Sequence, residues 1–432
     1  MIDTSVCIFW FRRDLRLFDN AGLYHALKSG HPVLPLFIFD SNILDELTSK
    51  DARVQFIHQE VSRIKSFLEE ECGSSFIIRH GKPLAIFKEI LEEYQVKAVF
   101  TNRDYEPYAQ QRDKEIYALL KESGVEFKGF KDQVIFDKNE VVKDDGTPYT
   151  VFTPFSKRYK QKLNKFYLSS YPTEKYHSNF AKIDALPEMD LEDIGFEPLE
   201  IDYPNREVED NLISNYHKTR DIPSIKGTSR ISLHLRFGTV SIRELARQAG
   251  EGKYFDELIW RDFYQMILFH FPNTVTESFR SKYDRISWRN NEEEFEKWCK
   301  GETGYPMVDA GMRELNESGY MHNRVRMVVA SFLTKHLLID WRWGEAYFAE
   351  KLLDYDQASN VGGWQWAAGS GVDAAPYFRV FNPKLQLEKF DPDLKYVKRW
   401  VPEYGTKKYP EPMVDHKEAR ERALSTYKRA LD

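Results

Sequence analysis

The chain has little cysteine, no membrane-length apolar run and almost no excess charge, and each shortage excludes a class of protein. Its three cysteines, Cys7, Cys72 and Cys299, are odd in number and far apart. This pattern argues against a disulfide framework or a structural metal and fits a reducing cytoplasm. The 62 basic and 68 acidic residues leave a net charge of −6. Nucleic-acid binding would therefore require a local basic surface.

The apolar runs are all too short to span a membrane. The first of them, Val6–Phe11, ends in Arg12-Arg13-Asp14 and is typical of a buried strand, not of a signal sequence. We expect a cytoplasmic protein without a membrane partner. A length of 432 residues favours two domains.

The first 130 residues alternate strand and helix patterns. Helical periodicity occurs at about 20–29, 53–70, 84–94 and 109–123. Strand patterns occur at Val6–Phe11, Val33–Phe39, Ser75–Arg79, Lys97–Thr101 and, more weakly, Glu126–Phe130. Such alternation predicts a doubly wound, Rossmann-like α/β domain with a parallel sheet. No G-x-G-x-x-G follows the first strand, which argues against dinucleotide binding there.

The rest of the chain has a different pattern. Residues 131–204 have weak periodicity and include an acidic, proline-bearing stretch at Ala185–Glu200. They indicate a long linker packed on the surface. From 205 to 432 the pattern is helical, with no internal repeat. The sequence thus predicts an α/β domain at 1–130, a linker at 131–204 and an all-helical domain at 205–432.

Tryptophan is nearly absent from the first half of the chain and abundant in the second. Trp10 is alone in the first half, and the other eight lie between Trp260 and Trp400. The run Asn360–Trp366 holds two of them beside a glycine pair, six residues after Asp354. Glycine lets the backbone approach another molecule closely. The run favours a planar cofactor, although a tight turn followed by buried rings has the same local pattern.

Two further segments carry polar groups suited to a ligand. Gly227–Ser232 stands at an expected helix start, where hydroxyls and free N–H groups bind an anion such as a pyrophosphate or simply cap the helix. Glu257, Trp260, Arg261 and Tyr264 share one helical face. This face suits a pocket for planar polar rings, and a solvated ion-pair face is the alternative.

The segment Met321–Met327 opens another apolar helix. Arg326 is suited to an internal ion pair with Asp354 or Asp356, whose loss would be costly. Arg324 points elsewhere and is suited to a phosphate. A helix start with exposed arginines is the alternative for this motif. A basic stretch with interleaved aromatic residues, typical of a nucleic-acid groove, comprises Tyr377, Phe378, Arg379, Lys384, Lys389, Lys395, Lys398, Arg399 and Trp400.

Together these motifs resemble the photolyase/cryptochrome family almost from end to end. The similarity includes Trp-Phe-Arg-Arg-Asp-Leu-Arg at 10–16, Gly-Thr-Ser-Arg-Ile-Ser at 227–232, Glu-Leu-Ile-Trp-Arg-Asp-Phe-Tyr at 257–264, Gly-Tyr-Pro at 304–306, Asn-Val-Gly-Gly-Trp-Gln-Trp at 360–366 and Phe-Asn-Pro at 381–383. The order and spacing of these motifs carry the resemblance. It implies an α/β domain, a linker and a helical domain that binds FAD.

The resemblance also implies roles for single residues. Asn360 would face flavin N5, where plant cryptochromes carry Asp, and a neutral amide there suits a reduced, anionic flavin. Trp364, Trp341 and Trp288 would form an electron-transfer triad, whereas Trp298, Trp343 and Trp400 are interpreted as structural. The implied FAD ligands are Tyr216, Thr228, Ser229, Arg230, Ile231, Ser232, Arg261, Asn323, Arg326, Asp354, Tyr355, Asp356 and Asn360.

Within the family, Met-His-Asn-Arg-x-Arg-Met resembles the class I photolyases that repair cyclobutane pyrimidine dimers in UV-damaged DNA. The resemblance implies that photoexcited reduced FAD donates an electron to the dimer, whose ring then splits, with Glu257 and Asn360 in catalytic roles. The lesion would leave the duplex to reach the flavin. The implied lesion and DNA contacts are Glu257, Trp260, Asn323, Arg324, Met327, Trp366 and Arg379, with Lys384 as a further phosphate contact.

The antenna pigment is where this chain departs from part of the family. Members that use folate carry Asn-Glu where this chain has Tyr108-Ala109, which argues against folate. A second chromophore, deazaflavin or another, stays open. We expect a monomer that associates with the nucleoid when bound to DNA. The alternative function is a cryptochrome-type blue-light signalling receptor without repair activity.

Overall fold

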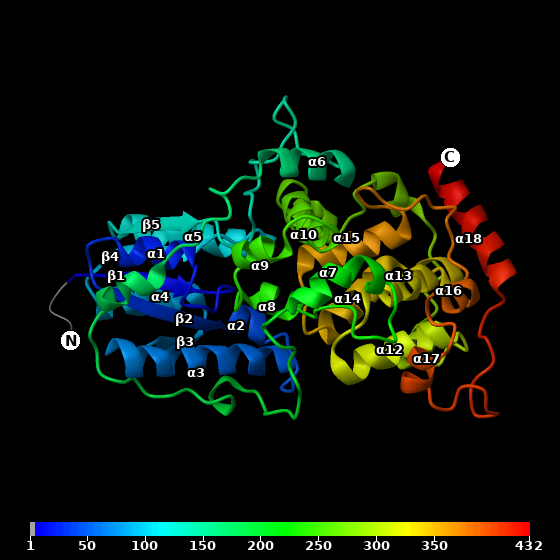
Figure 1. Cartoon of the computed structure of the whole chain (residues 1–432), viewed down its shortest axis with the longest axis horizontal. Helices are drawn as coiled ribbons and strands as arrows, with labels where there is room; N and C mark the ends of the chain where they lie inside the picture. The colour runs from blue at the N-terminus through cyan, green and yellow to red at the C-terminus, as the bar shows by residue number, and fades with distance from the viewer. Residues whose placement is uncertain (1–4) are drawn as a thin grey trace. The chain divides into compact units, whose positions relative to one another are not determined.

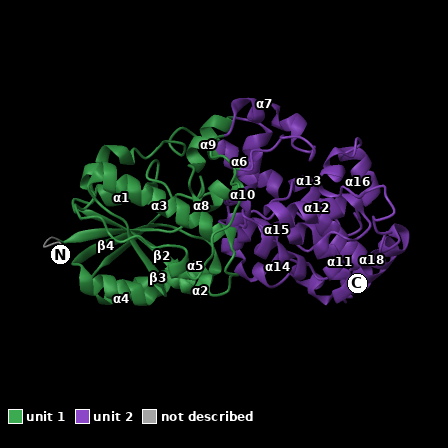
Figure 2. Ribbon diagram, turned by 90° about the horizontal axis from the view of Figure 1, so that it is seen from below, with its two compact units in different colours: residues 1–140, 162–207, 231–250 green, residues 141–161, 208–230, 251–432 purple. Residues whose placement is uncertain are grey.

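The computed structural model describes residues 5–432 and divides into two compact units, each built from separate segments (Figure 2). The first comprises Met1–Glu140, Lys162–Glu207 and Ile231–Gly250. The second comprises Val141–Gln161, Val208–Arg230 and Glu251–Asp432. The stretch 131–204, expected as a linker, contributes to both units. The domain boundaries drawn from the sequence stay a prediction.

The first unit contains a five-stranded parallel sheet (Figure 1). Its strands are β1 (Val6–Phe11), β2 (Val33–Asp40), β3 (Ile77–Gly81), β4 (Val96–Asn102) and β5 (Glu126–Phe130), in the order β3-β2-β1-β4-β5. Every neighbouring pair is parallel. Because the order reverses at β1, the sheet is doubly wound. The predicted fold class is confirmed.

Strand β1 shows why the buried strands have continuous apolar sequences. Ile8 and Trp10 pack in one cluster with Phe87 of α4 (Pro83–Glu93) and with α5 (Pro107–Glu122). Phe9 faces the other side, where it meets Gly22 of α1 (Ala21–Leu27). Helices cover both faces, so neither set of side chains contacts water. The unit's other helices are α2 (Ser41–Leu44), α3 (Ala52–Cys72), η1 (Thr173–Asn179), η2 (Glu192–Ile194), α8 (Ser232–Phe237) and α9 (Ile242–Ala249).

A cluster of four buried charges lies in the first unit. Asp132 accepts from Arg16 at 2.6 Å and from Arg243 at 2.8 Å. Arg243 also donates to Asp19 at 2.9 Å. The side chains of all four are at most 5% exposed. We call this group the Asp132 cluster, and each of its charges faces an opposite charge within it.

The second unit is helical. It contains nearly all of α6 (Phe152–Lys162), and then α7 (Asp210–Thr219), α10 (Lys253–His270), η3 (Pro272–Val275), η4 (Ser281–Arg285), α11 (Glu292–Lys300), α12 (Pro306–Ser318), α13 (Asn323–Ser331), the π-helix η5 (Phe332–Leu337), α14 (Trp341–Lys351), α15 (Gln357–Ala368), α16 (Pro383–Phe390), α17 (Lys395–Trp400) and α18 (His416–Leu431). Within residues 5–432, no helix combines the length and apolarity that crossing a membrane requires.

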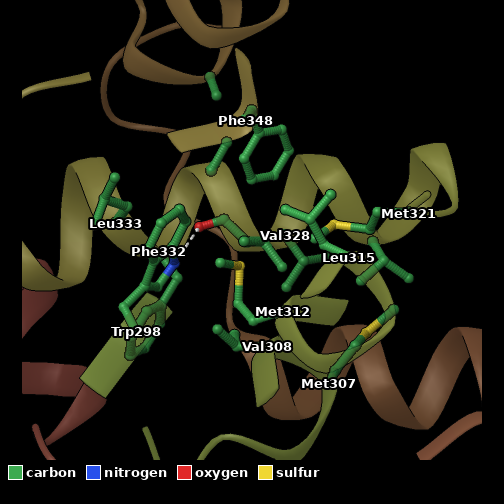
Figure 3. Close-up of a cluster of buried hydrophobic side chains, with 14 of the residues drawn as sticks. Trp298, Met307, Val308, Met312, Leu315, Met321, Val328, Phe332, Leu333 and Phe348 are labelled. Atoms are coloured by element: carbon green, nitrogen blue, oxygen red, sulfur yellow. Dashed lines mark hydrogen bonds between the residues drawn. The ribbon is translucent and has the colours of Figure 1, made fainter. Parts of the chain in front are cut away.

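The core of this unit surrounds Trp298, which is fully buried. Figure 3 shows its indole in a cluster that includes Phe332, Leu333 and methionines of α12. Its Nε1 donates to the Val329 carbonyl at 3.4 Å, so the buried polar atom has a partner. This hydrogen bond joins α11 to α13, whose first residues line the functional site described below.

Candidate functional site

A cavity of about 400 Å³ lies within the second unit. Its lining residues come from α10, α13, α14 and α15, together with Arg220 and the loop before α15. They are Arg220, Glu257, Trp260, Arg261, Tyr264, Asn323, Arg326, Met327, Ala330, Phe348, Leu352, Asp354, Asp356, Ser359, Asn360, Gly363, Trp364 and Trp366. Segments separated by more than 100 residues thus meet at one site.

Helix α10 presents the face expected from its spacing. Glu257, Trp260, Arg261 and Tyr264 all line the cavity, because positions i, i+3, i+4 and i+7 share one side of a helix. Leu258, at the next position, is buried in the protein instead.

The start of α13 is set by His322, whose Nδ1 accepts from the Arg324 backbone N–H at 3.1 Å. Burial lowers the pKa of His322 to about 4, so the ring is neutral and can accept. Arg326, one turn on, donates through Nη2 to both Asp354 oxygens at 3.1 Å. Its Nε also donates to the Met321 carbonyl at 2.7 Å. Of the two acids considered from the sequence, Asp354 is the ion-pair partner.

Asp356 has a different role, because it is the N-cap of α15. Its Oδ1 accepts from the Ser359 N–H at 3.0 Å, which caps the helix. Its Oδ2 accepts from Gln265 Nε2 at 2.8 Å. The cap and the cross-link to α10 fix where Asn360 and Gly363 meet the cavity.

The amide of Asn360 has a defined orientation. Its Nδ2 donates to the Glu345 carbonyl at 3.1 Å and to Glu345 Oε1 at 2.9 Å. A backbone carbonyl only accepts, so the NH₂ group must face Glu345 and the amide oxygen must face away. Burial raises the pKa of Glu345, and the hydrogen bonds from Asn360 and Tyr355 offset part of that rise. Asn360 therefore presents a neutral acceptor at the cavity.

The glycine pair of α15 separates into two roles. A methyl group on Gly362 would lie 2.3 Å from the Tyr264 ring, so glycine is needed for α15 to pack on α10. A methyl group on Gly363 would meet no protein atom within 4 Å, and Gly363 lines the cavity. Gly363 thus leaves a bare stretch of helix backbone facing the site.

Glu257 is half-buried and forms an ion pair with Arg220. Burial raises the pKa of Glu257, and the Arg220 guanidinium offsets part of that rise. The Arg220 guanidinium also lies 5.3 Å from the centre of the Tyr216 ring. The pair places a carboxyl group of raised pKa on the cavity wall.

The aromatic residues of the site divide between two sides. Trp260 stacks on Phe152 of α6 at 3.7 Å with an angle of 4° between the rings, so one face of its indole is already covered. Trp364 is buried and contacts Trp298 at 6.1 Å and Phe348 at 5.0 Å, both edge-on. Trp341 is buried in the same cluster, and Trp288 is partly buried against it.

Residues 216 and 228–232 are not among those that line this cavity. Thr228 Oγ1 lies 3.2 Å from Tyr320 Oη, and Ser229 Oγ accepts from Tyr254 Oη at 3.0 Å. Arg230 has a φ of +52° and its guanidinium lies over the Tyr320 ring at 4.2 Å. Ile231 and Ser232 belong to the first unit. The predicted anion site at 227–232 stays a prediction.

The DNA contacts expected from the sequence lie partly at the cavity and partly outside it. Met327, Trp260 and Trp366 line the cavity. Arg324 instead pairs with Asp221 at 2.7 Å and lies over the Phe390 ring at 4.3 Å. Arg379 lies over Phe381 at 5.4 Å, next to Phe378, which is 61% exposed.

Sequence reasoning did not select Arg220, Gln265 or Glu345. Their roles come from partners 15 to 91 residues away: Asn360 for Glu345, Glu257 for Arg220 and Asp356 for Gln265. No local spacing marks such pairs. Among the described residues, no group of three or more His, Cys, Asp or Glu side chains is placed to hold a metal ion.

Comparisons with known proteins agree over nearly the whole length. A model described as DNA photolyase matches residues 7–175, and one described as the FAD binding domain of DNA photolyase matches residues 254–406. The deoxyribodipyrimidine photo-lyase of Halobacterium salinarum is 35% identical over 98% of this chain and 99% of its own. A bacterial class III photolyase from Agrobacterium tumefaciens has a TM-score of 0.88 at 34% identity, with 100% of this chain and 98% of that chain covered. An archaeal photolyase from Sulfolobus tokodaii, described with two FAD molecules, has a TM-score of 0.81 at 35% identity, with 98% and 100% covered.

Proposed function

The chain belongs to the DNA photolyase family, and from that membership we propose that it uses light and FAD to split cyclobutane pyrimidine dimers in DNA. The observation that carries the proposal is the amide of Asn360. Glu345 turns its NH₂ group away from the cavity, so a neutral oxygen acceptor faces the site. A carboxylate in that place would repel a reduced, anionic ring.

The residues of the cavity fit FAD. A volume of about 400 Å³ lies within the usual range for ligand sites of about 300–1,000 Å³. The walls combine the Arg326–Asp354 pair, the acceptor of Asn360 and the bare backbone at Gly363. A flat ring system can approach that backbone closely. The proposed ligands are Tyr216, Thr228, Ser229, Arg230, Ile231, Ser232, Arg261, Asn323, Arg326, Asp354, Tyr355, Asp356 and Asn360.

When bound, FAD supplies light absorption and one-electron transfer. The protein's contribution is to bind, orient and exclude water. Asn360 would accept a hydrogen bond from an N–H of the ring, and Arg326 keeps its orientation through Asp354. Trp364 lies between the cavity and the buried tryptophan cluster. It is therefore proposed, with Trp341 and Trp288, to conduct electrons inward.

The lesion is proposed to enter the same cavity after leaving the duplex. A damaged, poorly stacked pair costs least to flip out. Trp260 and Trp366 flank its rings, and Asn323 and Met327 contact it. Glu257 lies on the cavity wall beside Arg220. It is proposed to hydrogen-bond the dimer, through its own proton or a bridging donor, as the dimer takes up charge. Arg324 and Arg379 hold backbone phosphates.

A repair assay tests the proposal. Flavin-loaded, chemically reduced protein is illuminated with an oligonucleotide that holds one thymine dimer, and we expect the dithymine to be restored. A dark sample is the control. No repair despite full flavin loading would contradict the proposal and leave a signalling receptor as the better explanation.

The triad is tested separately with Trp364→Phe. We expect photoreduction of the oxidised flavin to be largely lost, because Trp364 is the triad member that lines the cavity. Repair by chemically reduced Trp364→Phe protein should persist, since reduction is then supplied from outside. Unimpaired photoreduction would remove Trp364 from the electron path.

Three finer points belong to the same proposal. The class I assignment rests on the Met321–Met327 motif, while one structural relative is a class III enzyme. A second, antenna chromophore is proposed, and folate is disfavoured by Tyr108-Ala109. We also propose a cytoplasmic monomer. An absorption spectrum of the purified protein identifies the chromophores, and its sedimentation identifies the oligomeric state.

A further inference from the structure

A buried lysine of the second unit has no part in the proposed chemistry. Lys335 has 0% exposure. Burial lowers its pKa to about 8, and no charged neighbour offsets that effect. Removing an ammonium group from water without a carboxylate partner is costly. A lysine kept under these conditions needs an explanation.

The segment that contains Lys335 is buried along its whole length. This segment is the π-helix η5, all six of whose residues are buried. The π-helix ends at Leu337, and the residue that caps it, Leu338, has a φ of +53°. π-Helical segments are rare and occur frequently at functional sites. Lysines near a surface usually extend their ammonium group into solvent, and here the surrounding protein prevents it.

The Lys335 ammonium group contacts one loop and one helix. Its Nζ donates to the Tyr377 carbonyl at 3.0 Å and lies 5.4 Å from the centre of the Tyr427 ring in α18. The rings of Tyr377 and Tyr427 are nearly parallel, at 9° and 5.9 Å. We call Lys335, Tyr377 and Tyr427 the Tyr377 clamp. It holds both the backbone and the ring of Tyr377.

The clamped loop connects α15 to α16. Near one end, the Ser370 carbonyl accepts from the Arg280 N–H at 2.9 Å, and at the other Asn382 caps α16. Between these anchors, Phe378 is 61% exposed and Arg379 follows it. A side chain that must meet a phosphate needs a fixed backbone behind it. The clamp holds the residue immediately before these two.

We propose that Lys335 is a positioning residue that, by holding the Tyr377 carbonyl, presents Phe378 and Arg379 to the DNA backbone. This inference rests on the proposed function, in which Arg379 contacts DNA. Lys335 itself touches neither DNA nor the flavin cavity. Its contribution is to the affinity for DNA, not to the rate of repair on bound DNA.

The test compares wild-type protein with Lys335→Met, which keeps the length of the side chain and removes its charge and donor groups. We expect the dissociation constant for a thymine-dimer duplex to rise about tenfold, the loss of one charge-assisted hydrogen bond. Flavin content, the unfolding midpoint and the repair rate at saturating DNA should not fall. A purely structural lysine would instead lower the unfolding midpoint and leave DNA affinity alone.

The route of the effect is tested with Arg379→Ala. If Lys335 acts through this loop, Lys335→Met adds little to the loss already caused by Arg379→Ala. Additive losses overturn the inference. If Arg379→Ala binds the thymine-dimer duplex more weakly while Lys335→Met binds it normally, the inference is also overturned, and the proposed function stands. If Arg379→Ala binds the duplex normally, the loop does not take part in DNA binding. Both the role of Arg379 as a DNA contact and that of Lys335 as its positioning residue are then overturned.

Two further variants keep the test decisive. Lys65→Met is the matched control, because Lys65 is also buried but pairs with Glu69 at 2.9 Å in the first unit. It should lose stability and keep its DNA affinity. Tyr427→Leu removes the ring packed on Tyr377 without changing Lys335, and it should weaken DNA binding too. If Lys335→Met fails to fold, normal binding by Tyr427→Leu overturns the clamp.

Discussion

Two buried lysines, Lys65 in the first unit and Lys335 in the second, have opposite surroundings. Lys65 is 4% exposed and has a carboxylate partner one helical turn away, at Glu69. Lys335 is fully buried, and its acceptor is the uncharged carbonyl of Tyr377. A paired charge recovers much of the cost of burial, whereas a lone charge does not.

The larger charge groups repeat this difference. In the Asp132 cluster of the first unit, each carboxylate faces a guanidinium and all four side chains are sealed from water. In the second unit, the Arg326–Asp354 and Arg220–Glu257 pairs line a cavity and keep surface available to a ligand. We infer that charge in the first unit serves stability, while charge in the second serves binding at some cost in stability.

The largest expected effect comes from breaking the sealed cluster. Burial raises the pKa of Asp132, but Arg16 and Arg243 more than offset this, so its pKa lies below the usual value. Asp132→Asn leaves buried guanidinium charge uncompensated and should lower the free energy of unfolding by about 3–5 kcal/mol. Denaturant unfolding measures this. The exposed Asp393–Lys395 pair provides the control, because Asp393→Asn should cost less than about 1 kcal/mol. Equal losses of unfolding free energy in the two variants would show that buried and exposed ion pairs do not differ in their contribution to stability.

Lys335 should give the second unit an unusual dependence of stability on pH. Its folded pKa of about 8 lies below the ordinary value of 10.5. Between these values the unfolded chain binds a proton that the folded protein does not, so the free energy of unfolding rises with pH by about 3 kcal/mol across the window. Below pH 8 both states are protonated and the cost of burial is present in full.

The measurement is the difference in unfolding free energy between wild-type protein and Lys335→Met from pH 7.5 to 10. Two titratable groups near Lys335, Tyr427 and His336, do not change protonation in this range. Burial raises the pKa of Tyr427 well above the usual value, and burial lowers the pKa of its neighbour His336 to about 3. A difference that does not change with pH would show that Lys335 binds its proton equally in the folded and unfolded states, so that burial does not lower its pKa, and would weaken the contrast with Lys65.

Local periodicity made part of this structure predictable. The five strands and the crossover helices of the first unit follow from apolar runs, and the sheet confirms them. The cavity-facing side of α10 likewise follows from helical spacing, since Glu257 and Tyr264 are separated by about two turns. These features depend on residues close together in sequence, where backbone geometry alone fixes which side chains share a face.

Contacts between distant segments were not predictable. Nothing near Trp260 in sequence indicates that Phe152 covers one face of its indole, or that Glu345 fixes the amide of Asn360. The π-helix η5 is also absent from the sequence pattern, because its mixture of apolar, polar and charged residues does not distinguish a π-helix from an α-helix. Packing of the whole unit, and not local propensity, decides these details.

The Phe152 contact sharpens what Trp260 can do. With one indole face covered at 3.7 Å, a lesion ring can stack only on the other. Trp260→Ala should weaken binding to a thymine-dimer duplex by about 1–3 kcal/mol, the usual value for one base stacked on an aromatic ring. Trp343→Ala, whose indole packs edge-on against Phe295 at 5.2 Å, should leave this affinity unchanged. An unaltered affinity in Trp260→Ala would place the lesion elsewhere in the cavity.

Glu345→Gln should produce the smallest change in affinity of these variants. It tests whether a buried carboxylate of the second unit serves ligand binding or stability. Glutamine keeps an oxygen that accepts from Asn360 Nδ2, and the carbonyl of residue 345 still accepts as well. Replacing a charge-assisted bond by a neutral one should weaken flavin binding by about 1 kcal/mol, with little change in the free energy of unfolding. Glu345→Leu, which cannot accept from the amide, should cost more flavin affinity. If Glu345→Gln instead lowers stability as Asp132→Asn does while flavin affinity holds, the carboxylate belongs with the sealed charges of the first unit, and the orientation of Asn360 depends on the backbone alone.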